Sequence, residues 1–402
     1  MGESGDAPGG VDPERLLQQL RDRREEMAAA LRALAELESP TAEPDRQRAV
    51  FDRLAGSLEE AGFRCRHVPG REYGGVLLAV PEGRERGRPF QLLLGHADTV
   101  WPVGTLDEMP VTVADGEVRG PGTFDMKGGL VQAVFALRAL RERGLEPAVT
   151  PVLLVNADEE VGSPESRRHV ERLARRADRV FVLEPALGPT GALKTARKGT
   201  GSFTVTVRGK SAHSGLAPEE GASAIVALSE VVQRLHALND PDRGITVNVG
   251  TIEGGGRTNV IPGGARAEVG VRVARSEDVS ELLEEIRGLS PAVPGTTVEV
   301  EGELGRPPME RTPGVQLLWR AARRLGHRLG LELEEGRSGG ASDGNLTAPH
   351  APTLDGLGAV GDGAHAAHEH VRLDAMPERA ALLALLLLLP ETRTEARGRR
   401  TG

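Results

Sequence analysis

The sequence predicts an α/β protein with a mixed, mostly parallel sheet and a second, smaller α+β domain inserted into it. Two observations predict the sheet: short apolar strands alternate with helical segments, and acidic or histidine residues follow several of these strands directly. A third observation predicts the insertion. From residue 199 the strands alternate between apolar and polar residues, which is typical of half-exposed strands.

The length of 402 residues exceeds the usual size of a single hydrophobic core, so two domains are expected. We place the larger domain at residues 13–198 and 305–390, and the inserted domain at residues 199–304. The small, polar and charged residues of 1–12 and 391–402 predict two disordered tails.

In the larger domain, the strand most informative for function covers residues 90–94. This run is short and mostly apolar, and Gly95 follows it. Such a run favours a buried parallel strand over a helix. The other elements follow from helical spacing, proline starts and glycine stops. We expect helices at 13–37, 44–61, 127–143, 167–175, 314–326 and 380–389, and strands at 64–68, 76–80, 152–156 and 180–183.

The inserted domain is expected to hold strands at 201–209, 245–250, 265–273 and 297–301, with helices at 222–238 and 281–288. The order strand, helix, strand, strand, helix, strand is that of a ferredoxin-like unit.

Composition excludes several classes of function. The net charge is −9, and residues of both charge signs are interspersed along the helices rather than gathered into a basic face. One Tyr, two Trp and seven Phe provide few stacking surfaces, so nucleic acid is not an expected partner. Cys65 is the only cysteine, which rules out an intrachain disulfide. The N-terminal residues do not resemble a secretory signal, and the apolar run 380–389 is about half of the ~20 residues that a membrane helix needs. We therefore expect a soluble, cytoplasmic protein with no membrane partner.

Five side chains at predicted strand ends or in glycine-rich loops could meet at one edge of the sheet. Taken singly, such a histidine is more often held by hydrogen bonds, and such an acid is more often a helix cap. Together, two imidazoles and three carboxylates suit zinc first, with manganese or cobalt as alternatives, and favour two ions that share a carboxylate. The five candidate ligands are His96, Asp125, Glu160, Glu184 and His365.

Two acidic neighbours of these candidates are assigned other tasks. Asp98 faces the same way as His96 on an extended backbone, so one of the two can bind a metal while the other supports it. Adjacent Glu159 and Glu160 point apart, so one can bind a metal while the other acts as a general base.

A series of motifs then matches a known family. GHADTV, GPGTFDMKGG, ADEEVGS, LEP, GKSAHSG, NVIPG, SGGASDGN and GAHAAHEHV occur in this order between residues 44 and 389. The chain resembles the co-catalytic zinc metallopeptidases of the M20 family, in the glutamate carboxypeptidase and aminoacylase branch.

The resemblance implies a role for each candidate at the metal centre. Asp98 would orient His96, Glu159 would be the base, and a cis peptide bond would join Asp125 to Met126. Around a bridging Asp125, one ion would be held by His96 with Glu184 and the other by Glu160 with His365.

The resemblance also implies that the inserted domain forms a homodimer interface and that His213 reaches the partner's active site to stabilise the oxyanion. From the sequence alone, His213 is better explained as a loop histidine. Asn259 and Arg272 would line the substrate pocket, although Arg272 could equally be an exposed strand cation. Gly339 and Gly340 would offer backbone N–H groups to a substrate carboxylate.

The histidine motif departs from the family pattern, because His368 and His370 stand close to the ligand; we assign the ligand role to His365, which follows GDGA directly. The expected reaction is hydrolysis, by a metal-activated water, of an amide bond next to a free carboxylate. The substrate would be a C-terminal residue, a dipeptide or an N-acyl amino acid. The alternatives are an acyltransferase or amide synthase on the same scaffold and a non-catalytic ligand-binding relative.

Overall fold

The computed structural model describes residues 10–85 and 87–392, and the chain divides into two compact units. Unit 1 contains the described residues up to Ala196, Arg311–Ser338 and the described residues from Ser342 onward. Unit 2 contains Arg197–Glu310 and Gly339–Ala341. Each unit has its own hydrophobic core.

A six-stranded sheet with the strand order β1-β2-β6-β3-β7-β16 forms the centre of unit 1. Strands β6, β3, β7 and β16 run parallel, whereas β2 is antiparallel to both β1 and β6. The predicted α/β class with a mixed, mostly parallel sheet is therefore confirmed. The strands are β1 (Phe63–Val68), β2 (Val76–Pro81), β3 (Phe90–His96), β6 (Thr150–Asn156), β7 (Val180–Val182) and β16 (Thr353–Leu354).

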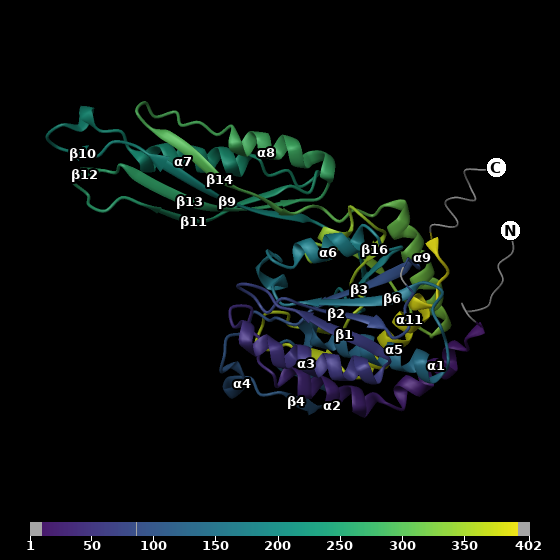
Figure 1. Ribbon diagram of the computed structural model, residues 1–402. Helices are drawn as coiled ribbons and strands as arrows, with labels where there is room; N and C mark the ends of the chain where they lie inside the picture. The colour runs from purple at the N-terminus through teal and green to yellow at the C-terminus, as the bar shows by residue number, and fades with distance from the viewer. Residues whose placement is uncertain (1–9, 86, 393–402) are drawn as a thin grey trace, which may run out of the picture. The chain divides into compact units, whose positions relative to one another are not determined.

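Helices cover both faces of this sheet, as Figure 1 shows. Leu93 of β3 packs into the core under α5 and α11, whereas Leu92 and Leu94 pack into the core under α6 and α10. The alternation follows from the two-residue period of a strand, and each fully buried leucine contributes about 1.5–3 kcal/mol. The helices of unit 1 are α1 (Pro13–Arg21), α2 (Arg24–Ala35), α3 (Pro44–Glu60), α4 (Thr105–Glu108), α5 (Gly128–Glu142), α6 (Arg167–Ala174), α9 (Pro313–Arg328), α10 (Gly344–Thr347) and α11 (Ala375–Leu387).

The single helix predicted at residues 13–37 is wrong, because the chain forms two helices there. Helix α1 ends at Arg21 and α2 begins at Arg24. Leu20 and Met27 are both buried, but the residues between them are charged or polar and give a continuous helix nothing to pack with.

The ordered part of the chain extends beyond the limits set for the predicted tails. Val11 is buried, and the Asp12 side chain caps α1 by accepting hydrogen bonds from two backbone N–H groups. At the other end, the Thr392 hydroxyl donates to Asp178 at 2.8 Å. The remaining residues of both predicted tails, 1–9 and 393–402, lie outside the described residues.

Two small sheets that the sequence did not predict complete unit 1. The sheet β17-β18-β5-β4 brings the segment before Asp125 beside the segment that follows His365, and β8 pairs with β15. These strands are too short to give a clear alternating pattern. They are β4 (Thr112–Ala114), β5 (Glu117–Arg119), β8 (Leu193–Arg197), β15 (Glu335–Ser338), β17 (Gly361–Asp362) and β18 (His370–Arg372).

Unit 2 is an antiparallel sheet with the order β11-β13-β9-β14 and the chain order β9, α7, β11, β13, α8, β14. This is the predicted order of strands and helices. Val205 of β9, Leu228 of α7 and Ile286 of α8 share one buried core. Its elements are β9 (Gly199–Arg208), β10 (Ala212–His213), α7 (Ala224–Ala237), β11 (Thr246–Gly254), β12 (Val260–Ile261), β13 (Gly264–Val273), α8 (Val279–Arg287) and β14 (Thr297–Arg306).

The apolar run near the C-terminus is part of α11, whose residues from Ala380 to Leu387 are fully buried. None of the helices in the described part of the chain combines the length and apolar character that crossing a lipid bilayer demands.

Candidate metal centre and active site

His96 is the last residue of the buried central strand β3, and its side chain is 1% exposed. Gly95 precedes it, and a Cβ atom there would lie 2.8 Å from the side-chain ends of both Leu130 and Met126, so a larger residue would require these two side chains to move. His96 Nδ1 lies 2.9 Å from the backbone oxygen of Asp98, which sets Nδ1 as the hydrogen-bond donor and turns Nε2 toward the other candidate ligands.

Asp125 lies between the two histidines. Its Oδ1 is 3.2 Å from His96 Nε2, and its Oδ2 is 3.5 Å from His365 Nε2. One carboxylate thus presents one oxygen to each imidazole. The peptide bond between Asp125 and Met126 is cis, as predicted.

Asp98 supports two parts of the site. Its carboxylate oxygen Oδ1 is 3.4 Å from His96 Nδ1, so the closer support of the imidazole is the Asp98 backbone oxygen rather than the predicted carboxylate. The carboxylate accepts hydrogen bonds from the backbone N–H groups of Glu159 and Glu160 at 3.3 and 3.2 Å, and from the Thr41 hydroxyl at 2.8 Å. Asp98 therefore also fixes the turn that carries the two glutamates.

Glu184 follows β7, and its Oε1 lies 3.5 Å from His96 Nε2. Two glycines allow other segments to approach this part of the chain. A Cβ on Gly129 or Gly358 would lie 2.0 or 2.1 Å from the Leu183 backbone oxygen, a distance that no side chain tolerates. The main chain before Glu184 is thus enclosed by two glycine backbones.

His365 comes from a loop rather than from a strand end. Its φ of +60° lies in the left-handed region, and its side chain is 49% exposed. Its Nε2 is 3.2 Å from Glu160 Oε2, so the same ring nitrogen lies close to both Glu160 and Asp125. A left-handed conformation costs about 1–2 kcal/mol for a residue other than glycine.

The other two histidines of this motif face other partners. His368 is 61% exposed and lies 3.7 Å from Asp362, whereas His370 lies 3.6 Å from Glu117. The structure therefore brings His365, rather than its two neighbours, to the cluster.

The pKa values of the candidate ligands are shifted by burial and by their contacts with one another. Burial opposes the charge on His96, but hydrogen bonds with Asp125, Asp98 and Glu184 raise its pKa well above the usual value. Hydrogen bonds with Asp125 and Glu160 raise the pKa of His365 to about 10. Burial also opposes the charge on Asp125, but the two imidazoles hold its pKa below the usual range. Burial raises the pKa of Glu160.

These residues fit divalent cations. Ligand atoms of His96, Asp125 and Glu160 all lie within 4.8 Å of one another, as do those of His96, Glu159 and Glu184. Glu160 Oε1 is buried and has no hydrogen-bond partner in the described part of the chain, a costly state that a cation would relieve. Nitrogen and oxygen donors without a thiolate suit a borderline or hard divalent ion.

The remaining predicted site residues lie in unit 2, where they form two groups. His213 pairs with Val260 in the ribbon β10-β12. Asn259 precedes Val260, and its backbone oxygen accepts a hydrogen bond from Ser214 N–H. Arg272 donates from Nη1 to the backbone oxygen of Gly339 at 2.6 Å. Gly340 accepts from Arg197 at 3.0 Å.

Sequence reasoning missed three supporting residues. Thr41 binds Asp98, as described, and the buried Lys127 ammonium donates to the backbone oxygen of Leu37 at 2.8 Å. Burial lowers the pKa of Lys127 to about 8. Glu369 is fully buried behind Asp125. The sequence signal for Glu369 is its place in the final histidine motif, between His368 and His370.

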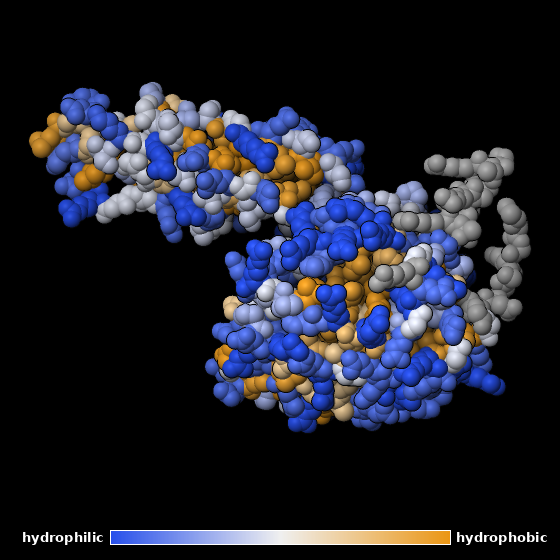
Figure 2. All heavy atoms as spheres, in the orientation of Figure 1, coloured by the Kyte–Doolittle hydropathy of each residue, from blue (hydrophilic) through white to orange (hydrophobic). Residues whose placement is uncertain are grey.

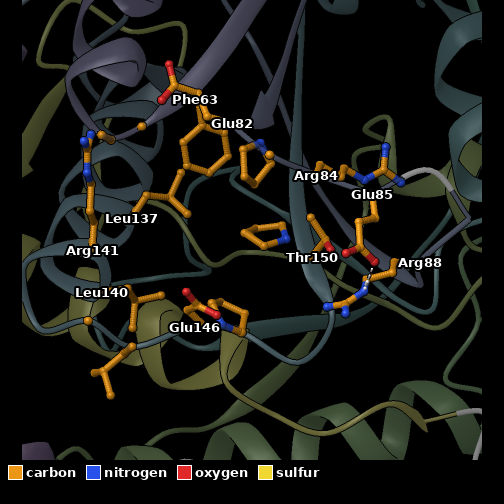
Figure 3. A pocket seen from close by; sticks show the side chains of 18 residues that line it. Phe63, Glu82, Arg84, Glu85, Arg88, Leu137, Leu140, Arg141, Glu146 and Thr150 are labelled. Carbon is orange, nitrogen blue, oxygen red and sulfur yellow. Dashed lines mark ion pairs between the residues drawn. The ribbon is translucent and has the colours of Figure 1, made fainter.

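A hollow of about 500 Å³ lies elsewhere in unit 1, where β1 and β6 begin and β2 ends (Figure 3). None of the predicted site residues lines it. Three arginines and three glutamates are among its lining residues, and one of these pairs, Arg88 and Glu85, is joined by an ion pair of 2.8 Å. This balance favours no particular charge on a ligand.

Comparison with known proteins gives a consistent result. The model of the family described as peptidase family M20/M25/M40 matches residues 92–389. Carboxypeptidase G2 from Pseudomonas sp. (strain RS-16) is 30% identical over 384 residues, covering 93% of this chain and 91% of that protein. Acetylornithine deacetylase from Myxococcus xanthus is 37% identical over 258 residues, covering 59% of this chain and 66% of that protein.

A solved structure extends the likeness to the fold. Aminopeptidase PepT from Bacillus cereus ATCC 10987 matches with a TM-score of 0.76 at 22% identity, covering 91% of this chain and 98% of that one. The resemblance inferred from the motifs is thereby confirmed. The chain belongs to peptidase family M20/M25/M40 and is a hydrolase acting on peptide or amide bonds.

Proposed function

We propose that the protein hydrolyses an amide bond next to a free carboxylate, in a C-terminal residue, a dipeptide or an N-acyl amino acid. One observation carries the proposal: Asp125 presents one carboxylate oxygen to His96 and the other to His365, with Glu159 close to the same cluster. The names of two relatives, a carboxypeptidase and an acetylornithine deacetylase, support this class of substrate.

Two divalent ions, zinc first, would bind around Asp125, one with His96 and Glu184 and the other with Glu160 and His365. When bound, such a pair supplies a Lewis acid for the scissile carbonyl and lowers the pKa of a water.

Glu159 acts as the general base. It is 7% exposed, and Asp98 fixes its backbone, so its carboxylate has a defined place beside the ligands. It takes one proton from the attacking water, whose oxygen bonds to the carbonyl carbon. It then gives this proton to the amide nitrogen as the carbon–nitrogen bond breaks. The second proton of the former water is lost from the new carboxyl group and taken up by the amine, so the products are a carboxylate and an ammonium group.

His213 supplies a donor to the oxyanion. Its Nδ1 accepts hydrogen bonds from the N–H groups of Gly215 and Leu216 at 3.1 and 3.2 Å. In the neutral ring the proton then resides on Nε2, which is left as a donor for developing negative charge. Asn259 would line the substrate pocket. Arg272, with Gly339 and Gly340, would bind the substrate carboxylate.

His213 would act across a homodimer formed by unit 2. Figure 2 shows apolar side chains among the polar surface of this unit. Strand β11 is an edge of the sheet, and its Ile252 is 58% exposed, while Val226 of α7 is 50% exposed and Leu216 is 81% exposed. An exposed edge strand beside apolar side chains is typical of a pairing surface.

The cytoplasmic location of the protein stays a prediction.

The first experiment tests the base. Glu159→Gln should bind metal as the wild type does but lose turnover of N-acyl amino acids and dipeptides, because the amide cannot accept a proton. Normal turnover would overturn the role of Glu159. Loss of metal would instead make Glu159 a ligand. A competing amine in the assay separates hydrolysis from acyl transfer.

The second experiment tests the partner's contribution. Glu159→Gln and His213→Ala would each be inactive alone. Random exchange of their subunits should restore about one quarter of the wild-type activity, because half of the dimers are mixed and each has one complete site. No recovery in a demonstrably mixed dimer would place His213 in the site of its own subunit, and normal activity of His213→Ala alone would place it outside catalysis.

A further inference from the structure

Glu369 is a buried carboxylate whose partners are all N–H donors. Oε1 accepts from the backbone N–H groups of Phe124 and Asp125 at 2.9 and 3.0 Å. Oε2 accepts from the Gly122 N–H at 2.9 Å and from the Trp101 indole N–H at 2.8 Å. Three of these four donors belong to the turn that carries the proposed bridging residue.

The same residue is tied to the loop that carries His365. Glu369 N–H donates to the Ala366 oxygen at 2.9 Å, and Ala366 N–H donates to the Gly363 oxygen at 2.8 Å. Gly363 has a φ of +82°, and a Cβ there would lie 2.8 Å from Glu369 N. The main chain from residue 363 to 369 is therefore tightly folded, and this folded segment connects His365 to Glu369.

We propose that Glu369 is a positioning residue of the metal centre, fixing the main chain that carries Asp125 relative to the loop that carries His365. This inference rests on the proposed metal centre. It assigns no contact between Glu369 and substrate or metal.

The chemistry of the contacts requires an acid at this position. A carboxylate accepts at both oxygens, so it satisfies four donors at once and compensates for its own burial. Glutamine has nearly the same shape, but its NH₂ group would face two N–H donors. That clash would be felt either at Phe124 and Asp125 or at Gly122 and Trp101. In the first case it acts directly on the backbone of the bridging residue.

Loss of this support should lower metal affinity. Asp125 Oδ2 and His365 Nε2 are 3.5 Å apart, and both belong to segments that contact Glu369. Loosening either segment weakens the ligand pair that they form. Supporting residues around metal ligands commonly change metal affinity by about 10–100-fold.

The test compares Glu369→Gln with the wild type after removal of metal by a chelator. Zinc or manganese is then titrated by calorimetry, and thermal unfolding of the metal-free protein is recorded alongside. We expect about a 10–100-fold loss of affinity for at least one ion in a variant that is folded without metal. His368→Ala is the matched control, since His368 lies in the same loop and is exposed, and it should titrate as the wild type does.

Trp101→Phe gives a second variant if Glu369→Gln fails to fold. It removes one donor to Oε2 and leaves the two bonds to Oε1 intact, so we expect a smaller loss of affinity in a folded protein. Wild-type affinity in every folded variant of this pair would overturn the positioning role while leaving the metal centre in place. A wild-type protein that binds no ion would overturn the metal centre and this inference together.

Discussion

The two histidines of the candidate metal centre occupy contrasting surroundings. His96 ends a buried central strand, is 1% exposed, and has its ring held by Asp98. His365 comes from a loop, has a positive φ, and is 49% exposed. A strand end is fixed by the whole sheet, whereas a loop must be fixed by local contacts. The His96 half of the candidate centre is therefore preformed by the fold, whereas the His365 half depends on supporting residues.

The largest expected effect comes from removing the residue that both halves share. Asp125→Ala should lower affinity for both ions by more than the ~100-fold that supporting residues reach, and should abolish hydrolysis. Calorimetry and metal analysis after dialysis would measure it. Retention of one tightly bound ion would show that the halves are independent and that Asp125 is not shared.

Stability of the metal-free protein should separate the two histidines. His96→Ala leaves buried carboxylates without their imidazole, and removing one partner of a buried pair costs about 3–5 kcal/mol. His365→Ala affects a half-exposed group, so about 1 kcal/mol or less is expected. Urea unfolding of both variants, treated with the same chelator, makes the comparison. Equal losses would show that the contrast in burial has no energetic consequence.

Metal uptake should strengthen as pH rises. In the metal-free protein the pKa of His365 is raised to about 10, so at neutral pH a proton occupies the imidazole that an ion must displace. Affinity on the His365 side should therefore increase with pH toward that value, by up to about tenfold per pH unit for each proton released. Calorimetry in buffers of different ionisation enthalpy would count the protons. In His365→Ala this contribution should disappear.

The smallest effect on metal affinity is expected at Thr41. Thr41→Val keeps the shape but removes the hydrogen bond to the Asp98 carboxylate, which should cost about 1.5–3 kcal/mol of stability. Asp98 keeps its contacts with the two glutamate backbones, so metal affinity should change less than it does in Glu369→Gln. A larger loss of affinity at Thr41 would show that the His96 half also depends on side-chain support.

The same contrast explains how far the sequence could predict the structure. His96 was predictable because an apolar strand with a glycine end has a recognisable pattern, and a parallel sheet gathers its strand ends at one edge. His365 was assigned from its motif, because a left-handed loop residue carries no periodic signal. The break between α1 and α2 was missed because helical spacing persists across charged residues that bury nothing.

Supporting residues were the hardest to predict. Asp98 was expected to support His96 through its carboxylate, yet its backbone oxygen is the closer contact, and a main-chain atom leaves no trace in residue type. Thr41 and Glu369 contact segments 57 and 244 or more residues away along the chain. Contacts of that range follow from the assembled sheets, several of whose strands are too short to be read from the sequence.

The glycines beneath Glu184 set a limit on redesign of this enzyme. Gly129 and Gly358 each approach the Leu183 oxygen more closely than any side chain allows. A library that varies these two positions would displace Glu184 before it altered substrate preference. Val100 and Val161 are 43% and 52% exposed and lie close in sequence to Asp98 and Glu160. Varying these two residues would leave the contacts of Gly129 and Gly358 with Leu183 intact. At Gly129 and Gly358, this backbone arrangement therefore leaves no room for a side chain.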